Sequence, residues 1–164
     1  MTALPEAAAR VAAAARALGL DVTIREMPAS TRTAEEAAAA CGCTVARIAK
    51  SLVFRGRVTG TPFLLLVSGA HRVDETAVAA VLAEPLARTD AADVRALTGY
   101  AIGGIPPFGH TTAIATFIDE TLLGHPTVWA AAGTPRCVFE IAPADLARAA
   151  AARPIAVTSP STSA

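Results

Sequence analysis

The chain has 164 residues with 14 basic and 14 acidic side chains, so its formal net charge is zero. This length suits a single domain that buries about two-thirds of its unfolded surface around one core. The charge balance argues against a broad nucleic-acid-binding face, because such a face needs many cations to displace counterions from phosphates. It is compatible with a pocket that binds one end of a nucleic acid.

Cysteine usage and hydropathy favour a soluble cytoplasmic protein without a membrane segment. The three cysteines, Cys41, Cys43 and Cys137, are too few and odd in number for a disulfide framework. Cys41 and Cys43 have C-x-C spacing and no paired histidines nearby, so small buried thiols are expected rather than a zinc site. The alanine-rich amino terminus is interrupted by charged residues, unlike a signal peptide or a membrane span.

The amino-terminal part of the chain predicts two helices around one strand. Proline and glycine positions predict a helix over 5–19, and alternating residues predict a strand over 21–27. Thr33 and Glu36 have the spacing of a capping box. A second helix is therefore expected to begin there and to end at Gly42.

The next segment predicts a hairpin that includes a central strand. A short helical turn is predicted over 44–49 and a strand over 51–55, which would place Lys50 at their junction. A turn bounded by glycines is predicted over 56–60. The continuous apolar run over 61–69 has the length of a strand that is covered on both faces.

The rest of the chain predicts further short elements of both kinds. Helices are predicted over 74–83, 90–99 and 143–150, and strands over 113–119, 127–133 and 136–141. Strands and helices are interleaved without a strict βαβ rhythm, so we expect one α+β domain with a mixed β-sheet or distorted barrel flanked by helices. We assign residues 1–157 to this domain and 158–164 to a flexible polar tail.

Lys50 is the first candidate for a functional residue. It is the only lysine, since the other 13 basic residues are arginine, and it lies within an apolar stretch. Burial lowers the pKa of an amine, and such a lysine can act as a base, form a Schiff base or present a point charge to a phosphate or carbonyl. The alternative is a snorkelling lysine, but an arginine could replace that, so a functional role is predicted.

The segment GGIPPFGH, Gly103 to His110, is the second candidate. Glycines let a backbone approach a ligand closely, and paired prolines stiffen a loop. His110 could hydrogen-bond a substrate or shuttle a proton. A structural turn with a surface histidine is the alternative explanation.

The end of the predicted central strand carries Ser68, Gly69 and His71. A serine nucleophile with His71 as its base is disfavoured, because no G-x-S-x-G elbow is present. A turn that lines a pocket is expected instead. Asp119 and Glu120 are neighbours on a predicted strand, so they point to opposite faces and do not form a catalytic pair.

Several segments together resemble the YbaK/prolyl-tRNA synthetase associated domain family. They are IAKSLVFR, LLLVSGAHRVD, TGYAIGGIPPFGH, FIDETLL and VWAAAGTPRCVFEIAPADL, in this order, and the resemblance covers about residues 20–150. The K-[ST]-L and G-x-x-P-x-x-x-H motifs are specific in combination. The family's members hydrolyse the ester that joins a wrong amino acid to tRNA, commonly tRNA(Pro), on a barrel-like mixed sheet with flanking helices.

The resemblance implies roles for individual residues. Lys50 would engage the 3′-terminal adenosine and orient the scissile ester. Substrate binding would fall to Ser68, Gly69, Gly103, Gly104, Pro106 and His110. No metal or organic cofactor is implied.

The resemblance also implies a substrate and partners. It indicates a trans-acting editing deacylase for tRNA(Pro) carrying a small wrong amino acid (Ala, Ser, Thr or Cys). Ala131 occupies the position where cysteine-specific relatives carry a serine, which lowers the expectation for Cys. The partners would be the aminoacyl-tRNA acceptor end and either prolyl-tRNA synthetase or an elongation factor.

Two alternatives to this deacylase stay open. The first is a non-catalytic module of the same fold that binds an amino acid or an aminoacyl ester. The second is an unrelated α/β hydrolase that uses Ser68, which predicts that Ser68→Ala abolishes ester cleavage while Lys50→Ala spares it.

Overall fold

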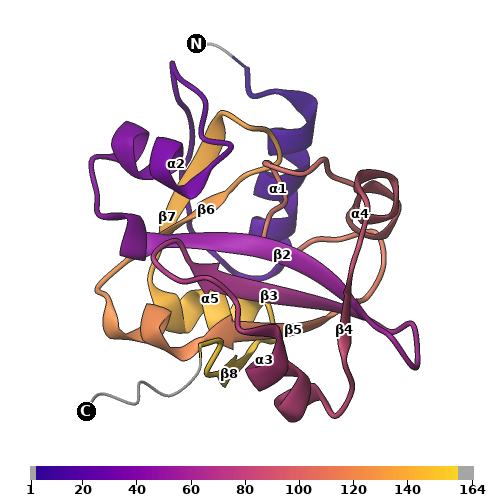
Figure 1. Cartoon of the computed structure of the whole chain (residues 1–164). Coiled ribbons are helices and arrows are strands. Elements are labelled where there is room, and N and C mark those ends of the chain that lie inside the picture. Colours follow the sequence, from indigo (N-terminus) through magenta and orange to yellow (C-terminus); the bar gives the residue numbers. More distant parts are fainter. Residues whose placement is uncertain (1–2, 159–164) are drawn as a thin grey trace.

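The structure is a computed structural model, and it describes residues 3–158. Its strands are β1 (Ile24–Glu26), β2 (Ile48–Gly56), β3 (Pro62–Ser68), β4 (Leu86–Arg88), β5 (Ala115–Asp119), β6 (Val128–Ala131), β7 (Cys137–Ile141) and β8 (Arg153–Ile155). They form one mixed sheet in the order β1-β7-β6-β2-β3-β5-β8, with β4 paired to β2 outside this path. The sheet ends at β1 and β8, so it is open rather than closed into a barrel (Figure 1).

Helices lie on both faces of this sheet. They are α1 (Glu6–Ala17), α2 (Ala34–Cys41), α3 (Glu75–Leu82), α4 (Ala91–Thr98) and α5 (Pro143–Ala149), with short 3₁₀ helices η1 (Val45–Arg47) and η2 (Glu120–Gly124). Within residues 3–158, no helix combines the length and the apolarity needed to cross a membrane.

The central strand β3 shows how the core is divided. Leu64 and Leu66 pack in the cluster formed with α1, α4 and α5, whereas Leu65 and Val67 pack in the cluster formed with α3. All four side chains are fully buried. Successive strand residues point to opposite faces, so a continuous apolar run is what a strand covered on both faces requires. The α+β prediction is thereby confirmed.

Local capping follows the sequence signals closely. The Thr33 hydroxyl accepts the Glu36 N–H, and the Glu36 carboxylate accepts the Thr33 N–H, so the predicted capping box of α2 is present. The side chains of Asp74 and Asp90 cap α3 and α4 by accepting the N–H groups of Ala77 and Asp93. These bonds satisfy N–H groups that have no partner within their own helix.

The placement of Lys50 differs from the prediction. The strand β2 begins at Ile48, so Lys50 is its third residue and does not lie at a helix–strand junction. The preceding helical turn is only the three residues of η1, because the apolar segment from Ile48 pairs at once with β3 and β6. Of the predicted tail 158–164, residues 159–164 lie outside the described part of the chain.

Candidate functional site

The strand β2 has a gap along one of its edges. Its other edge pairs with β3 without interruption from Ala49 to Arg55. On the gapped edge, β6 pairs with β2 only as far as Ala49, and β4 begins to pair at Phe54. Residues 50–53 therefore lie between two partner strands, and Figure 1 shows this stretch of β2 between β6 and β4. We refer to it as the sheet gap.

Two cavities meet at the sheet gap. The first, about 330 Å³, lies between the start of α2 and β6. The second, about 290 Å³, lies between β4 and the segment that leads into α3. The residues common to both linings are Lys50, Ser51, Leu52, Ile102 and Ile105. Among the described residues, Lys50 is the only charged residue in both linings, so it lies at the boundary between the two cavities.

The Lys50 ammonium is held by a backbone carbonyl. Its Nζ donates to the His71 carbonyl oxygen at 2.7 Å. Burial lowers the pKa of Lys50, the nearby Glu35 carboxylate opposes that effect, and Arg72 adds to it. An ammonium has three N–H donors, and residues 3–158 accept one of them, so two are available to a ligand.

The turn over residues 68–71, whose His71 carbonyl accepts the Lys50 hydrogen bond, is anchored by a buried carboxylate. Asp119, which is 1% exposed, accepts the Ser68 N–H at 3.1 Å and pairs with His71 Nδ1 at 2.7 Å. Its second oxygen accepts both the N–H and the hydroxyl of Thr121. Burial raises the pKa of Asp119, but these hydrogen bonds outweigh it and hold the pKa below its usual value. The His71 carbonyl is thus fixed from β5.

The glycine–proline loop covers the sheet gap. Gly103 lines the first cavity at φ +94°, and a Cβ there would come within 2.6 Å of Arg32 Cγ. A Cβ on Gly104 would lie 2.8 Å from the Thr134 backbone nitrogen. The Gly104 carbonyl in turn accepts the Gly133 N–H at 2.8 Å. Glycine at both positions lets this loop lie directly against its neighbours.

Two other residues of this loop act within it. His110 Nε2 donates to the Pro106 carbonyl at 2.7 Å, and burial lowers the pKa of His110, which that bond only partly offsets. Neither His110 nor Pro106 belongs to the described linings of the two cavities. Their bond closes the loop on itself, and their contact with a substrate stays a prediction.

Ser68 and Gly69 form hydrogen bonds to the chain just before β2 and at its first residue. Ser68 is 2% exposed, and its hydroxyl donates to the Ala46 carbonyl. The Gly69 N–H donates to the Ile48 carbonyl, and a Cβ there would lie 2.4 Å from the Val45 carbonyl oxygen. Neither residue is part of the described cavity linings. Because the Ser68 hydroxyl donates to the Ala46 carbonyl rather than to the His71 ring, the geometry does not supply the serine–histidine pair of a serine hydrolase.

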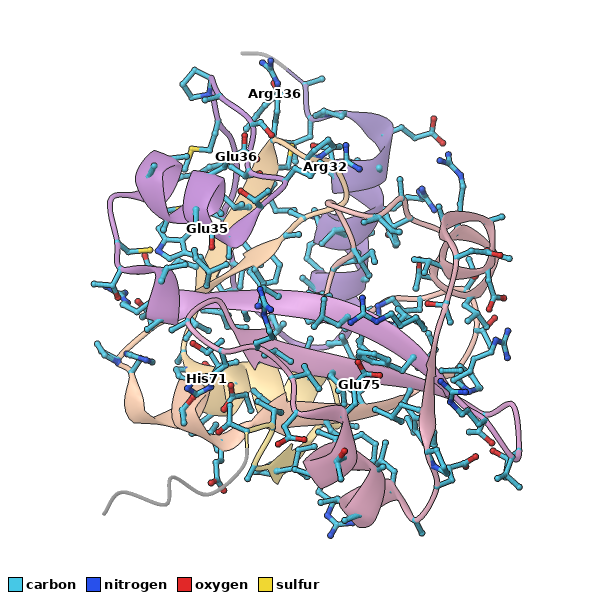
Figure 2. The ribbon with its side chains drawn as sticks, in the orientation of Figure 1. Arg32, Glu35, Glu36, His71, Glu75 and Arg136 are labelled. Atoms are coloured by element: carbon cyan, nitrogen blue, oxygen red, sulfur yellow. The ribbon has the colours of Figure 1, made fainter. Side chains whose placement is uncertain are left out.

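Sequence reasoning missed several residues of the first cavity. The hydroxyl oxygens of Thr31 and Ser51 are buried there, and residues 3–158 provide no hydrogen-bond partner for either. Trp129 also lines this cavity. Figure 2 shows Glu35 on the side of α2 that faces β2, and Glu35 lines the first cavity as well. Sequence spacing could not reveal these contacts, because they join segments far apart in the chain.

The cysteines take no part in the site. Cys41, Cys43 and Cys137 are free, and burial raises the pKa of Cys41 to about 11, which disfavours its reactive thiolate. Residues 3–158 contain no group of three or more His, Cys, Asp or Glu side chains arranged to hold a metal ion.

Comparisons with known proteins identify one family and several similar proteins. The aminoacyl-tRNA editing domain family matches residues 28–149. The uncharacterized protein YwhH of Bacillus subtilis (strain 168) is 33% identical over 127 residues, which cover 77% of this chain and 78% of that protein. The crystal structure of a candidate trans-editing enzyme for prolyl tRNA synthetase is 43% identical, with a TM-score of 0.90 over 96% of this chain and 100% of that chain. The hypothetical protein APE2540 is 28% identical, with a TM-score of 0.83 over 90% and 98% of the two chains.

Proposed function

Because the chain belongs to the aminoacyl-tRNA editing domain family, we propose that it is a trans-acting deacylase that hydrolyses the ester of mischarged aminoacyl-tRNA. The observation that carries this proposal is the position of Lys50, the charged group common to both cavities at the sheet gap. The similarity to a candidate trans-editing enzyme for prolyl tRNA synthetase supports tRNA(Pro) as the substrate. Net charge near zero suits an enzyme that binds the acceptor end rather than the whole tRNA surface.

The first cavity is proposed to hold the amino acid. Its wall is formed largely by small and apolar residues, among them Ala37, Ile48, Trp129, Ala130 and Ala131. Such a wall accepts a small acyl group and excludes a larger one by size, as in a second-sieve editing site. Alanine, serine, threonine and cysteine are the amino acids that we propose as substrates, with cysteine the least favoured because Ala131 supplies no hydroxyl.

The second cavity is proposed to hold the terminal nucleotide. Arg72 and Arg88 both line it, and guanidinium groups bind phosphate oxygens through paired N–H donors. Arg88 also pairs with Glu75 at 3.4 Å, but its side chain is 83% exposed and that pair is free to rearrange. With the nucleotide here and the amino acid in the first cavity, the ester would lie beside Lys50.

Lys50 is proposed to stabilise the charge that develops during hydrolysis. Water adds to the ester carbonyl carbon, the bond from that carbon to the ribose oxygen breaks, and the products are a free amino acid and a restored ribose hydroxyl. The carbonyl oxygen becomes an oxyanion on the way. The two free N–H donors of the Lys50 ammonium can bind it, and loss of one such donor typically costs about 10²–10³ in kcat.

A panel of aminoacyl-tRNAs tests this proposal. tRNA(Pro) charged with Ala, Ser, Thr, Cys or Pro is incubated with the protein, and release of the amino acid is followed over time. We expect cleavage of one or more of the small species while prolyl-tRNA(Pro) is spared. Binding of an amino acid or ester without cleavage of any species would favour the non-catalytic module instead.

A further inference from the structure

The register of β2 determines where the backbone groups of Ser51 point. Gly69 N–H donates to Ile48 O, and Gly56 N–H donates to Thr61 O. In an antiparallel pair, hydrogen-bonded and non-hydrogen-bonded residues alternate, and the β2–β3 register is continuous between these two bonds. The even-numbered residues of β2 therefore exchange hydrogen bonds with β3. Ser51 is odd-numbered, so its N–H and C=O point away from β3 and into the sheet gap.

The neighbouring odd-numbered residues of β2 find partners where Ser51 does not. Ala49 pairs with Ala130 of β6, and Arg55 pairs with Ala87 of β4. The Val53 carbonyl accepts the hydroxyl of Thr89 at 2.8 Å. Among residues 3–158, Ser51 alone of these four positions has neither its N–H nor its C=O paired, and its hydroxyl also lacks a partner. Three polar groups of one residue thus face the two cavities.

An unpaired donor and acceptor on one strand residue match the polar groups of an amino acid. In a hydrogen-bonded antiparallel pair, each residue donates its N–H to the other and accepts with its C=O. An aminoacyl ester offers the same two groups, an α-amino donor and a carbonyl acceptor attached to the same α-carbon. The free stretch of residues 50–53 spans about 10 Å at the rise of a strand, which leaves room for one residue of ligand.

We infer that the aminoacyl ester binds in the sheet gap as a strand residue would, its α-amino group donating to Ser51 O and its carbonyl accepting from Ser51 N–H. This inference rests on the proposed function and specifies which part of the substrate the protein recognises. The Ser51 N–H is then a donor to the ester carbonyl in addition to Lys50. Because recognition uses backbone groups, the amino acid side chain makes none of these bonds, and the wall of the first cavity alone selects it by size.

Nuclear magnetic resonance on the wild-type protein tests the contact without relying on activity. The probe is 3′-alanylamino-3′-deoxyadenosine, an amide that the protein cannot cleave as an ester, and its propionyl counterpart lacks only the α-amino group. We expect the alanyl probe to shift the Ser51 amide resonance and to slow its hydrogen exchange about tenfold or more. The Arg55 amide, which β4 already pairs, is the matched control and should not change. The propionyl probe should bind more weakly.

Two variants separate the backbone of Ser51 from its hydroxyl. Ser51→Pro removes the N–H, which the β2–β3 ladder does not use, so the strand is expected to persist. Its kcat/KM for the cleaved aminoacyl-tRNA should fall about 100-fold. Ser51→Ala keeps the N–H and removes an unpaired buried hydroxyl, so its Tm should equal or exceed that of wild type, with a smaller loss of kcat/KM. If Ser51→Pro fails to fold, the resonance experiment decides.

The outcomes distinguish this inference from the proposed function. Cleavage of aminoacyl-tRNA with an unmoved Ser51 amide on probe binding would overturn the inference and leave the deacylase standing. A shifted Ser51 amide without cleavage of any ester would support the inference and refute the deacylase. Absence of both binding and cleavage would refute both.

Discussion

Gly104→Ala should distort the site through contacts that no side-chain rotation can relieve. A Cβ at this position would lie 2.8 Å from the Thr134 nitrogen and 2.9 Å from the Gly133 carbonyl carbon, both of them backbone atoms. The loop must therefore move away from the segment after β6, which weakens the hydrogen bond from Gly133 N–H to Gly104 O. Overpacking costs about 1–3 kcal/mol and the weakened bond about 1 kcal/mol, so unfolding should become easier by about 2–4 kcal/mol.

Urea unfolding and thermal melting measure this loss directly. For a chain of this size the expected cost corresponds to a Tm lower by about 5–15 °C. Since the same loop carries Gly103 and Ile105 into the first cavity, deacylation should fall about 10- to 100-fold as well. Gly124→Ala is the matched control, because a Cβ there meets no atom within 4 Å, and it should change stability by less than about 0.5 kcal/mol. A Gly104→Ala protein as stable as this control would refute the packing argument.

Three further changes test other parts of the site. Thr31→Val keeps the shape of the side chain and removes an unpaired buried hydroxyl, so we expect an unchanged or higher Tm and a kcat/KM lowered about tenfold. Thr116→Val is the control, because the Thr116 hydroxyl donates to a carbonyl. It should lower the free energy of unfolding by about 1 kcal/mol and leave kcat/KM unchanged. Asp119→Ala should cost about 3–5 kcal/mol at neutral pH. Because the folded pKa of Asp119 lies below its ordinary value of 3.8, the charge-dependent part of that difference should be fully present above this pH and be lost as the pH falls through the lower folded value, which urea unfolding across the acid range would show. Ala131→Leu narrows the first cavity, so kcat/KM should fall more for threonyl- than for alanyl-tRNA(Pro).

The sequence predicted those elements whose ends or burial depend on residues close together in the chain. The capping box at Thr33 and the caps at Asp74 and Asp90 are made by residues three apart, which spacing alone can identify. The apolar run that became β3 was equally clear. The strands β4 and β8 were missed, because each has three residues and β8 contains a proline. Their pairing is set by tertiary contacts rather than by propensity.

The residues of the candidate site likewise fall into those that the sequence identified and those that only the tertiary structure reveals. Lys50 was identified because a single lysine in an arginine-rich chain is unusual, and Gly103 because glycine and proline are clustered around it. Ser51 and Thr31 carry no such signal, since a serine and a threonine are ordinary residues until the sheet register and the cavity give them significance. The support that Asp119 provides to the His71 turn depends on the pairing of β3 with β5, a contact between strands far apart in sequence.

Single-turnover deacylation by Lys50→Ala tests the central claim most directly. The substrate is the mischarged tRNA(Pro) that the wild-type protein cleaves fastest, and circular dichroism establishes that the variant is folded. Arg148→Ala, which removes a cation from an exposed ion pair on α5, is the control for loss of positive charge. The account predicts a rate at least about 100-fold below wild type for Lys50→Ala and an unchanged rate for the control. Wild-type deacylation by Lys50→Ala would contradict it.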